Sequence, residues 1–193
     1  QQAPKVVDTY VRKDAVNIDG PWQLTFPANW GAPTSPQQVN KLASWTESTD
    51  DGIKYFSGTA TYTKTFDVKK DVLKSGKLWL DLGSVGDIAV VTVNGGKPDT
   101  LWHTPYRTDV SGQLKSGKNT IQVQVTNEWT NRIAGDRLAP AGKKILASAP
   151  TPFNANRAFG PRVPVLPQAG LIGPVKLIAE SKQAPLPAPI ENH

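Results

Sequence analysis

The strongest constraint on the fold is an alternation of polar and apolar residues with a period of two. In the stretch SGTATYTKTFDV (57–68), Ala60, Tyr62, Lys64 and Phe66 fall on one face, and threonines occupy the other. Strict alternation in residues of high β-propensity is typical of a strand. The alternation recurs in GPWQLTF (20–26), KLWLDLG (77–83), DIAVVTVNGG (87–96), KSGKNTIQVQVTN (115–127) and LIGPVKLIAE (171–180). We therefore expect strands in all of these segments.

Turn signals separate the expected strands. Asn94-Gly95 is a hairpin signal because both residue types tolerate positive φ, and Ser116-Gly117 marks another turn. No segment shows a long amphipathic helical period, and LASWTEST (42–49) is the best short helical candidate. Strands at near-regular spacing with glycine-rich turns predict an all-β fold, an antiparallel β-sandwich or a barrel.

Two stretches interrupt this rhythm. Residues 27–54 form a long insertion between the first two expected strands, where we expect Trp30 and Trp45 to anchor it. Residues 129–168 are rich in Pro, Ala, Arg and Asn and have little periodicity. Loops of this length in a compact domain are usually functional or packed over a face. We expect the core to contain Trp22, Tyr62 and Trp79. We expect the proline-rich tail to be a linker or a frayed end.

Composition excludes several classes of function. The chain has no cysteine, which removes disulfides, thiolate nucleophiles and zinc–thiolate sites. It has no apolar run of about 18 residues, so no membrane-spanning helix is expected. The net charge is +6, but the basic residues are scattered, without a basic helix or finger spacing, which argues against nucleic acid. A solvated basic surface explains this charge, and an anionic polysaccharide is the favoured acidic partner.

The polar start QQAPK indicates either a cleaved signal peptide, and thus a secreted or periplasmic protein, or a module boundary.

Several motifs in order resemble a known family. The stretches GIKYFSGTATYTKTFDV, LDLGSVGDIAVVTVNG and LWHTPYRTDVSGQLKSGKNTIQVQVTNEWTNRIAGD resemble the sugar-binding-type domain of glycoside hydrolase family 2. They are even more similar to the β-sandwich domain of large bacterial α-L-rhamnosidases of glycoside hydrolase family 106. The resemblance implies a galactose-binding-like jelly roll over residues 16–180, preceded by an extension (1–15) and followed by a proline-rich tail (181–193). In such enzymes the domain accompanies a separate catalytic barrel, and a barrel of about 250 residues does not fit beside a sandwich in this chain. Domains of this fold often hold a structural calcium, so the resemblance leaves that cofactor open.

Catalytic arrangements are poorly supported. Only two histidines are present, and a Ser-His-Asp site would have to use His103 with Asp99 or Asp109. No nucleophile-elbow motif GxSxG accompanies them, so we favour a loop hydrogen bond for His103. Glycoside hydrolysis needs two carboxylates about 5–10 Å apart. Glu128 is the one carboxylate of interest, because it could contact a sugar hydroxyl, and pairing with Arg132 is the favoured alternative.

Sugar binding has a physical basis in two segments. Pyranose C–H faces stack on aromatic rings, while hydroxyl groups need polar partners, and binding sites combine these two kinds of group. The candidate ligand-binding residues are Trp102, His103, Tyr106, Arg107, Glu128, Trp129, Asn131 and Arg132. The structural alternatives are that the two tryptophans are core or loop anchors, that Tyr106 packs at a strand start and that Arg107 pairs with a carboxylate.

Three functions follow from these observations. The first is a non-catalytic carbohydrate-binding or accessory module of a rhamnosidase-like bacterial glycoside hydrolase, acting on plant or microbial polysaccharide. The second is a purely structural domain that braces a catalytic barrel. The third, a small stand-alone glycosidase, has the least support from the residues.

Overall fold

The structure is a computed structural model that describes residues 9–140, 142–146 and 165–183. The long strands follow the alternating segments. The strands are β1 (Tyr10–Asn17), β2 (Trp22–Thr25), β3 (Gln37–Val39), β4 (Thr59–Val68), β5 (Lys77–Asp81), β6 (Ser84–Gly86), β7 (Ile88–Val93), β8 (Asp99–Leu101), β9 (Arg107–Asp109), β10 (Gly117–Thr126), β11 (Gly170–Gly173) and β12 (Lys176–Lys182). The helices are the 3-10 helix η1 (Trp45–Glu47), α1 (Asp51–Lys54), α2 (Lys70–Leu73) and α3 (Thr130–Leu138).

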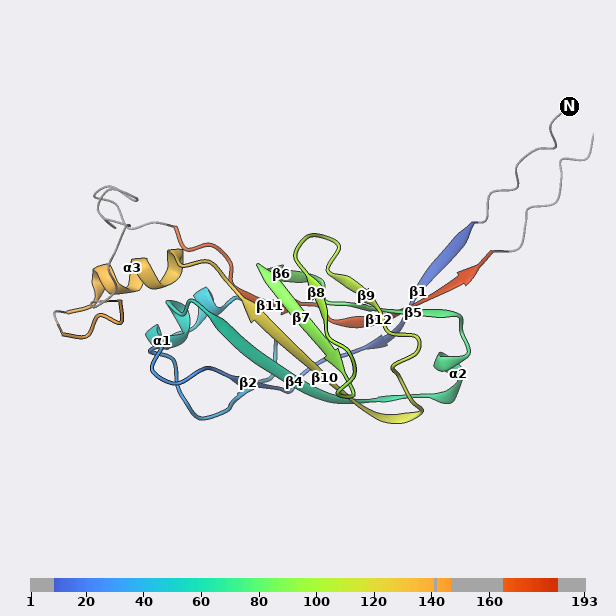
Figure 1. The fold of residues 1–193 in the computed structure, drawn as a ribbon. Coiled ribbons are helices and arrows are strands. Elements are labelled where there is room, and N and C mark those ends of the chain that lie inside the picture. The colour runs from blue at the N-terminus through green and yellow to red at the C-terminus, as the bar shows by residue number, and fades with distance from the viewer. Residues whose placement is uncertain (1–8, 141, 147–164, 184–193) are drawn as a thin grey trace, which may run out of the picture.

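Two antiparallel sheets form the layers of a sandwich (Figure 1). One has the order β3-β2-β4-β10-β7-β8, the other β1-β12-β5-β9, and the short pair β11-β6 lies apart from both. All pairings between these strands are antiparallel. The predicted all-β antiparallel sandwich is confirmed. The expected hairpin is confirmed too, since Asn94 and Gly95 adopt positive φ between β7 and β8.

The core lies between the two larger sheets and is built by the alternating residues. Tyr62 and Trp22 are fully buried, as the alternation predicted. Trp45 is also buried and donates its indole N–H to the Tyr62 hydroxyl at 2.6 Å, which anchors the first long insertion to the core. Burial raises the pKa of Tyr62 to about 12, although bonds from Leu171 and Trp45 oppose the shift. Trp79 is only partly buried, contrary to its expected core position, and Lys77 Nζ lies 4.1 Å from its ring centroid.

The structure adds elements that the alternation did not predict. β1 begins at Tyr10, inside the expected extension of residues 1–15, and pairs with β12 up to Lys182. The second long stretch is not only loop, because α3 occupies its first part. Its part from 147 to 164 lies outside the described residues, as does the proline-rich tail from 184. β7, β10 and β8 position the loops described next.

Candidate functional site

Two loops leave the same end of the six-stranded sheet. Ile88, the first residue of β7, pairs with Thr126, the last residue of β10. Its neighbour Ala89 pairs with Leu101, the last residue of β8. The segments 102–106 and 127–132 therefore start side by side, on either side of the first residues of β7. We call these two segments, together with Asp87 and Ile88, the rim.

Asp87 joins the two loops. Its backbone carbonyl accepts a hydrogen bond from the Tyr106 hydroxyl at 2.6 Å, and its carboxylate accepts one from the Glu128 backbone N–H at 3.2 Å. Its own N–H donates to the Thr126 carbonyl at 3.0 Å. Partial burial raises the pKa of Asp87; the Glu128 N–H opposes this shift and the Glu128 charge adds to it. Burial, followed by the nearby Asp87 charge, also raises the pKa of Tyr106. Asp87 thus holds both loops in place.

Aromatic side chains flank this junction and face solvent. Trp102 is 69% exposed and meets His103 edge to face, with ring centroids 4.7 Å apart. Trp129 is 51% exposed and lies 5.5 Å from Trp30, centroid to centroid. Neither tryptophan is a core residue, so the core alternative for them is wrong. Trp30 is partly buried against the core, and its ring contacts the ring of Trp129. The rim therefore presents two indole surfaces to solvent, with the Glu128 side chain also exposed.

Arg107 forms an ion pair within the framework of the fold. It begins β9, and its Nε and Nη2 donate to Asp81 Oδ2 at 3.1 and 2.5 Å. The expectation that it pairs with a carboxylate is confirmed. Tyr106 is buried beside it at the strand start, as the structural alternative predicted. Of the candidate ligand-binding residues in this first stretch, Trp102 and His103 are exposed.

Asn131 and Arg132 are buried in α3. The Arg132 backbone N–H donates to Ser57 Oγ at 3.0 Å, and its Nε donates to the Tyr55 carbonyl at 2.9 Å. Its Nη1 lies 3.6 Å from Asp136 Oδ1, so the favoured pairing with Glu128 is wrong. Burial lowers the pKa of Arg132, and the Asp136 charge opposes that shift. Asn131 is fully buried, which removes it from a solvent-facing site.

The contacts of His103 and of its two candidate carboxylates do not form a catalytic arrangement. His103 Nδ1 lies 2.9 Å from the Thr104 carbonyl, the loop contact expected for it. Asp99 accepts from Thr108, and Asp109 accepts from Ser111, so the structure shows neither carboxylate orienting His103. Within the described residues, no three Asp, Glu or His side chains gather to hold a metal ion.

Sequence reasoning did not assign Asp87 or Ile88 to the site, and it predicted Trp30 only as an anchor of the first insertion. Asp87 and Glu128 are 41 positions apart, and only strand register brings them together. One signal in the sequence could have identified Asp87. It directly precedes the alternating stretch that forms β7, the strand that pairs with β10. Ile88 is 42% exposed at this point, although it begins an otherwise buried strand.

Comparisons with known proteins agree with this architecture. A model of the family described as glycosyl hydrolase 2 galactose-binding domain-like matches residues 45–157. A Formosa agariphila protein provisionally named a beta-glucuronidase is 39% identical over 90% of this chain and 16% of its own length. The solved structure of a rhamnosidase from Novosphingobium sp. PP1Y superimposes with a TM-score of 0.76 at 39% identity, covering 94% of this chain and 16% of that one. The chain thus spans about a sixth of the length of these two relatives. Among the described residues, no helix is long and apolar enough to span a bilayer.

Proposed function

The chain belongs to the glycosyl hydrolase 2 galactose-binding domain-like family, and from this premise we propose that it is a carbohydrate-binding accessory domain of a larger bacterial glycoside hydrolase. The polysaccharide is of plant or microbial origin, and the rim is the surface that contacts it. A polymer of that kind lies outside the cytoplasm, which would make the protein secreted or periplasmic. The catalytic domain of the same parent enzyme is the second partner.

The observation that supports this function most is the exposure of two tryptophans on either side of one polar junction. Trp102 and Trp129 each have more than half of their surface in solvent, and exposed apolar groups gathered at one place mark interaction sites. An indole face matches the C–H face of a pyranose, and the nearby Glu128 carboxylate can accept bonds from sugar hydroxyls. His103, in contact with Trp102, provides a further hydrogen-bonding group.

The parent enzyme is proposed to be rhamnosidase-like. The support is the 39% identity to the Novosphingobium rhamnosidase over nearly the whole chain. The Formosa relative has a different provisional name, beta-glucuronidase, at the same identity. The net charge of +6 supports an anionic polymer as one ligand to test.

Affinity electrophoresis of the 193-residue chain in gels containing pectin, rhamnan or galactan tests the proposal. We expect at least one polymer to retard the chain, and Trp102→Ala or Trp129→Ala to reduce the retardation several-fold. Tyr10→Ala is the matched control, because Tyr10 is an equally exposed aromatic residue on β1 in the other sheet. Unchanged mobility in all three polymers would count against direct binding.

A second function, bracing of the catalytic domain, is favoured by Ile88. An exposed isoleucine between the two loops adds apolar surface that a sugar would not need. If this is the main role of the rim, Trp102→Ala weakens association with the separately expressed remainder of the parent enzyme. In that case the polymers leave the wild-type chain unretarded.

A further inference from the structure

A line of uncharged polar side chains crosses the outer face of the six-stranded sheet. The register places Gln38 beside Gln23, Gln23 beside Thr63, Thr63 beside Gln122, and Gln122 beside Thr92. Alternate residues of these strands face the core, so this row lies on the opposite face of the sheet. Neighbouring strands lie about 4.8 Å apart, so the row presents evenly spaced amide and hydroxyl groups. We call it the amide row.

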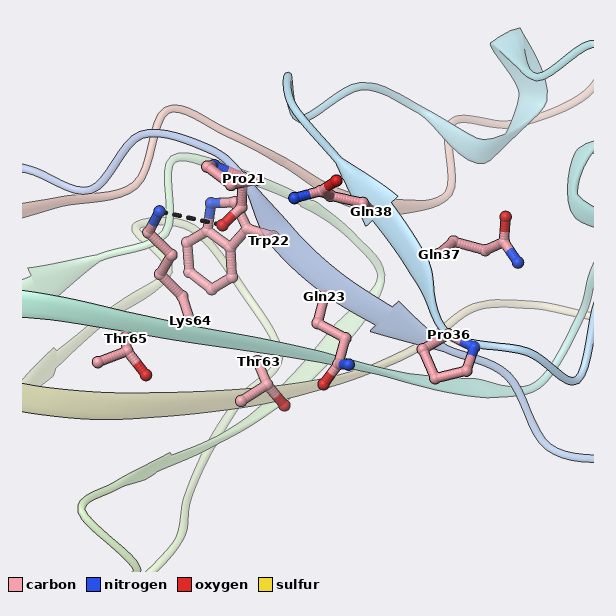
Figure 2. Close-up of a pocket in the computed structure, with 9 residues that line it drawn as sticks. All are labelled: Pro21, Trp22, Gln23, Pro36, Gln37, Gln38, Thr63, Lys64 and Thr65. Carbon is pink, nitrogen blue, oxygen red and sulfur yellow. Dashed lines mark hydrogen bonds between the residues drawn. The ribbon is translucent and has the colours of Figure 1, made fainter.

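A groove lies at the β3–β2–β4 end of the amide row (Figure 2). Its volume is about 450 Å³, within the range of about 300–1,000 Å³ that is usual for small-molecule sites. Apolar and polar groups both line it. The exposed rings of Pro21 and Pro36 lie among the side chains of Gln23, Gln38 and Thr63. Figure 2 shows Gln23 and Thr63 extending in the same direction from adjacent strands.

The groove contains hydrogen-bonding capacity that the described protein leaves unused. No hydrogen bond within the described residues engages the side chains of Gln23, Gln38 or Thr63. Lys64 is the single charged lining residue, and its ammonium is bonded to the Pro21 carbonyl at 3.0 Å. Apart from Lys64, the surface therefore offers neutral donors and acceptors.

The chemistry of the amide row favours one of three kinds of partner: a protein, an anionic ligand or a ligand rich in hydroxyl groups. Protein interfaces are depleted of charge but rely on exposed aromatic or arginine anchors, and the amide row has none. An anionic ligand would find one cation here, Lys64, whose ammonium also donates to the Pro21 carbonyl, among otherwise uncharged lining residues. Hydroxyl groups, in contrast, pair with amide side chains in both directions, as donor and as acceptor.

We propose that the groove and the amide row bind an uncharged saccharide chain that lies across the strands. Gln23, Gln38 and Thr63 bond sugar hydroxyls, and the exposed rings of Pro21 and Pro36 contact the C–H faces. The inference rests on the proposed function for its class of ligand, but it assigns a separate surface that shares no residue with the rim.

The test is affinity electrophoresis of the 193-residue chain in neutral galactan, xylan, mannan and dextran. The double variant Gln23→Glu/Gln38→Glu places two carboxylates in the groove without changing its shape, and Thr63→Val removes one hydroxyl while preserving β-propensity. Gln183→Glu, on an exposed residue after β12, is the matched control. Unfolding midpoints establish that each variant is folded.

We expect at least one neutral polymer to be bound, with its Kd raised about tenfold or more by the double variant, less by Thr63→Val, and not by Gln183→Glu. If the polymer is still bound by the double variant but lost in Trp102→Ala, the groove inference is wrong and the proposed function stands. If no polymer of either panel is bound, both fail. If the double variant instead weakens association with the rest of the parent enzyme, this face is a domain interface and the inference is overturned.

Discussion

At the scale of single residues, the raised pKa of Asp87 has a consequence for the stability of the chain. Its raised pKa means that ionisation is less favourable in the folded chain than in the unfolded one. This penalty is fully present above the folded pKa and disappears below the ordinary value of 3.8. We expect Asp87→Asn to raise the Tm at pH 7, because asparagine can still accept the Glu128 N–H without bearing a charge. The gain should shrink to nothing in thermal melts between pH 7 and pH 3.

The control for this experiment is Asp19→Asn, at an exposed carboxylate between β1 and β2. It should leave the Tm at pH 7 close to that of the wild type. An Asp87→Asn variant that melts lower than the wild type at pH 7 would show that the carboxylate stabilises the rim, contrary to its raised pKa.

The Arg107–Asp81 pair makes a second prediction at this scale. Both side chains are mostly buried, and Asp81 also accepts the Gly83 N–H at 2.8 Å. Removing Arg107 leaves a poorly solvated carboxylate with that single partner, so Arg107→Ala should cost roughly 2–4 kcal/mol of unfolding free energy, measured by urea denaturation. Lys176→Ala breaks the more exposed pair with Asp14 and should cost only about 0–1 kcal/mol. Equal losses in the two variants would contradict this account.

At the scale of elements, the sequence predicted strands wherever one face is buried. β4 and β10 alternate buried and more exposed residues along most of their length, and their expected boundaries were close to the observed ones. β1 was missed because none of its residues is fully buried, so no alternation marks it. Its position comes from pairing with β12, which is a long-range property.

α3 shows why the second long stretch was not predicted as helical. The helix buries polar residues, Asn131, Arg132 and Asp136, instead of an apolar stripe. Asp136 accepts the backbone N–H groups of Ile145 and Leu146, so α3 is stabilised by partners outside the helix. Residue periodicity contains no signal for such contacts.

The candidate site was predicted in part for the same reason. Trp102 and Trp129 were correctly placed in loops that share one end of the sheet. Arg107 and Arg132 were also plausible ligand contacts by residue type, but their carboxylate partners, Asp81 and Asp136, lie where only the fold reveals them. Sequence identifies which chemical groups are available, and packing determines which of them are already used.

Gly135 gives a prediction for α3. Alanine in the middle of a helix is normally favoured over glycine by about 1 kcal/mol. Here an added Cβ would lie 2.5 Å from Tyr55 Cβ, so the helix could not keep its place. We expect Gly135→Ala to destabilise the chain and to increase hydrogen exchange in α3. Gly112→Ala, where nothing lies within 4 Å of the added Cβ, should change neither.

At the scale of the whole molecule, the rim and the amide row lie on different parts of the sandwich. The rim lies at the end of the six-stranded sheet from which α3 departs, and β1 extends toward the opposite end (Figure 1). The amide row lies on the outer face of that sheet, between β3 and β7. A domain arranged in this way can contact a catalytic domain or polymer at its rim and still leave a sheet face open.

This arrangement also predicts what the isolated chain does not do. Glycoside hydrolysis requires two carboxylates flanking a bound sugar, one as acid and one as base or nucleophile. Asp87 and Glu128 are the acidic pair at the rim, but Asp87 is occupied by the Glu128 N–H and Glu128 stands exposed to solvent. We expect no nitrophenol release above the blank from nitrophenyl α-L-rhamnoside or β-D-glucuronide, with a rhamnosidase and a β-glucuronidase as the respective positive controls. Turnover that Glu128→Gln abolishes and Glu47→Gln preserves would make the chain an enzyme in its own right, because a contaminating hydrolase would not respond to either substitution.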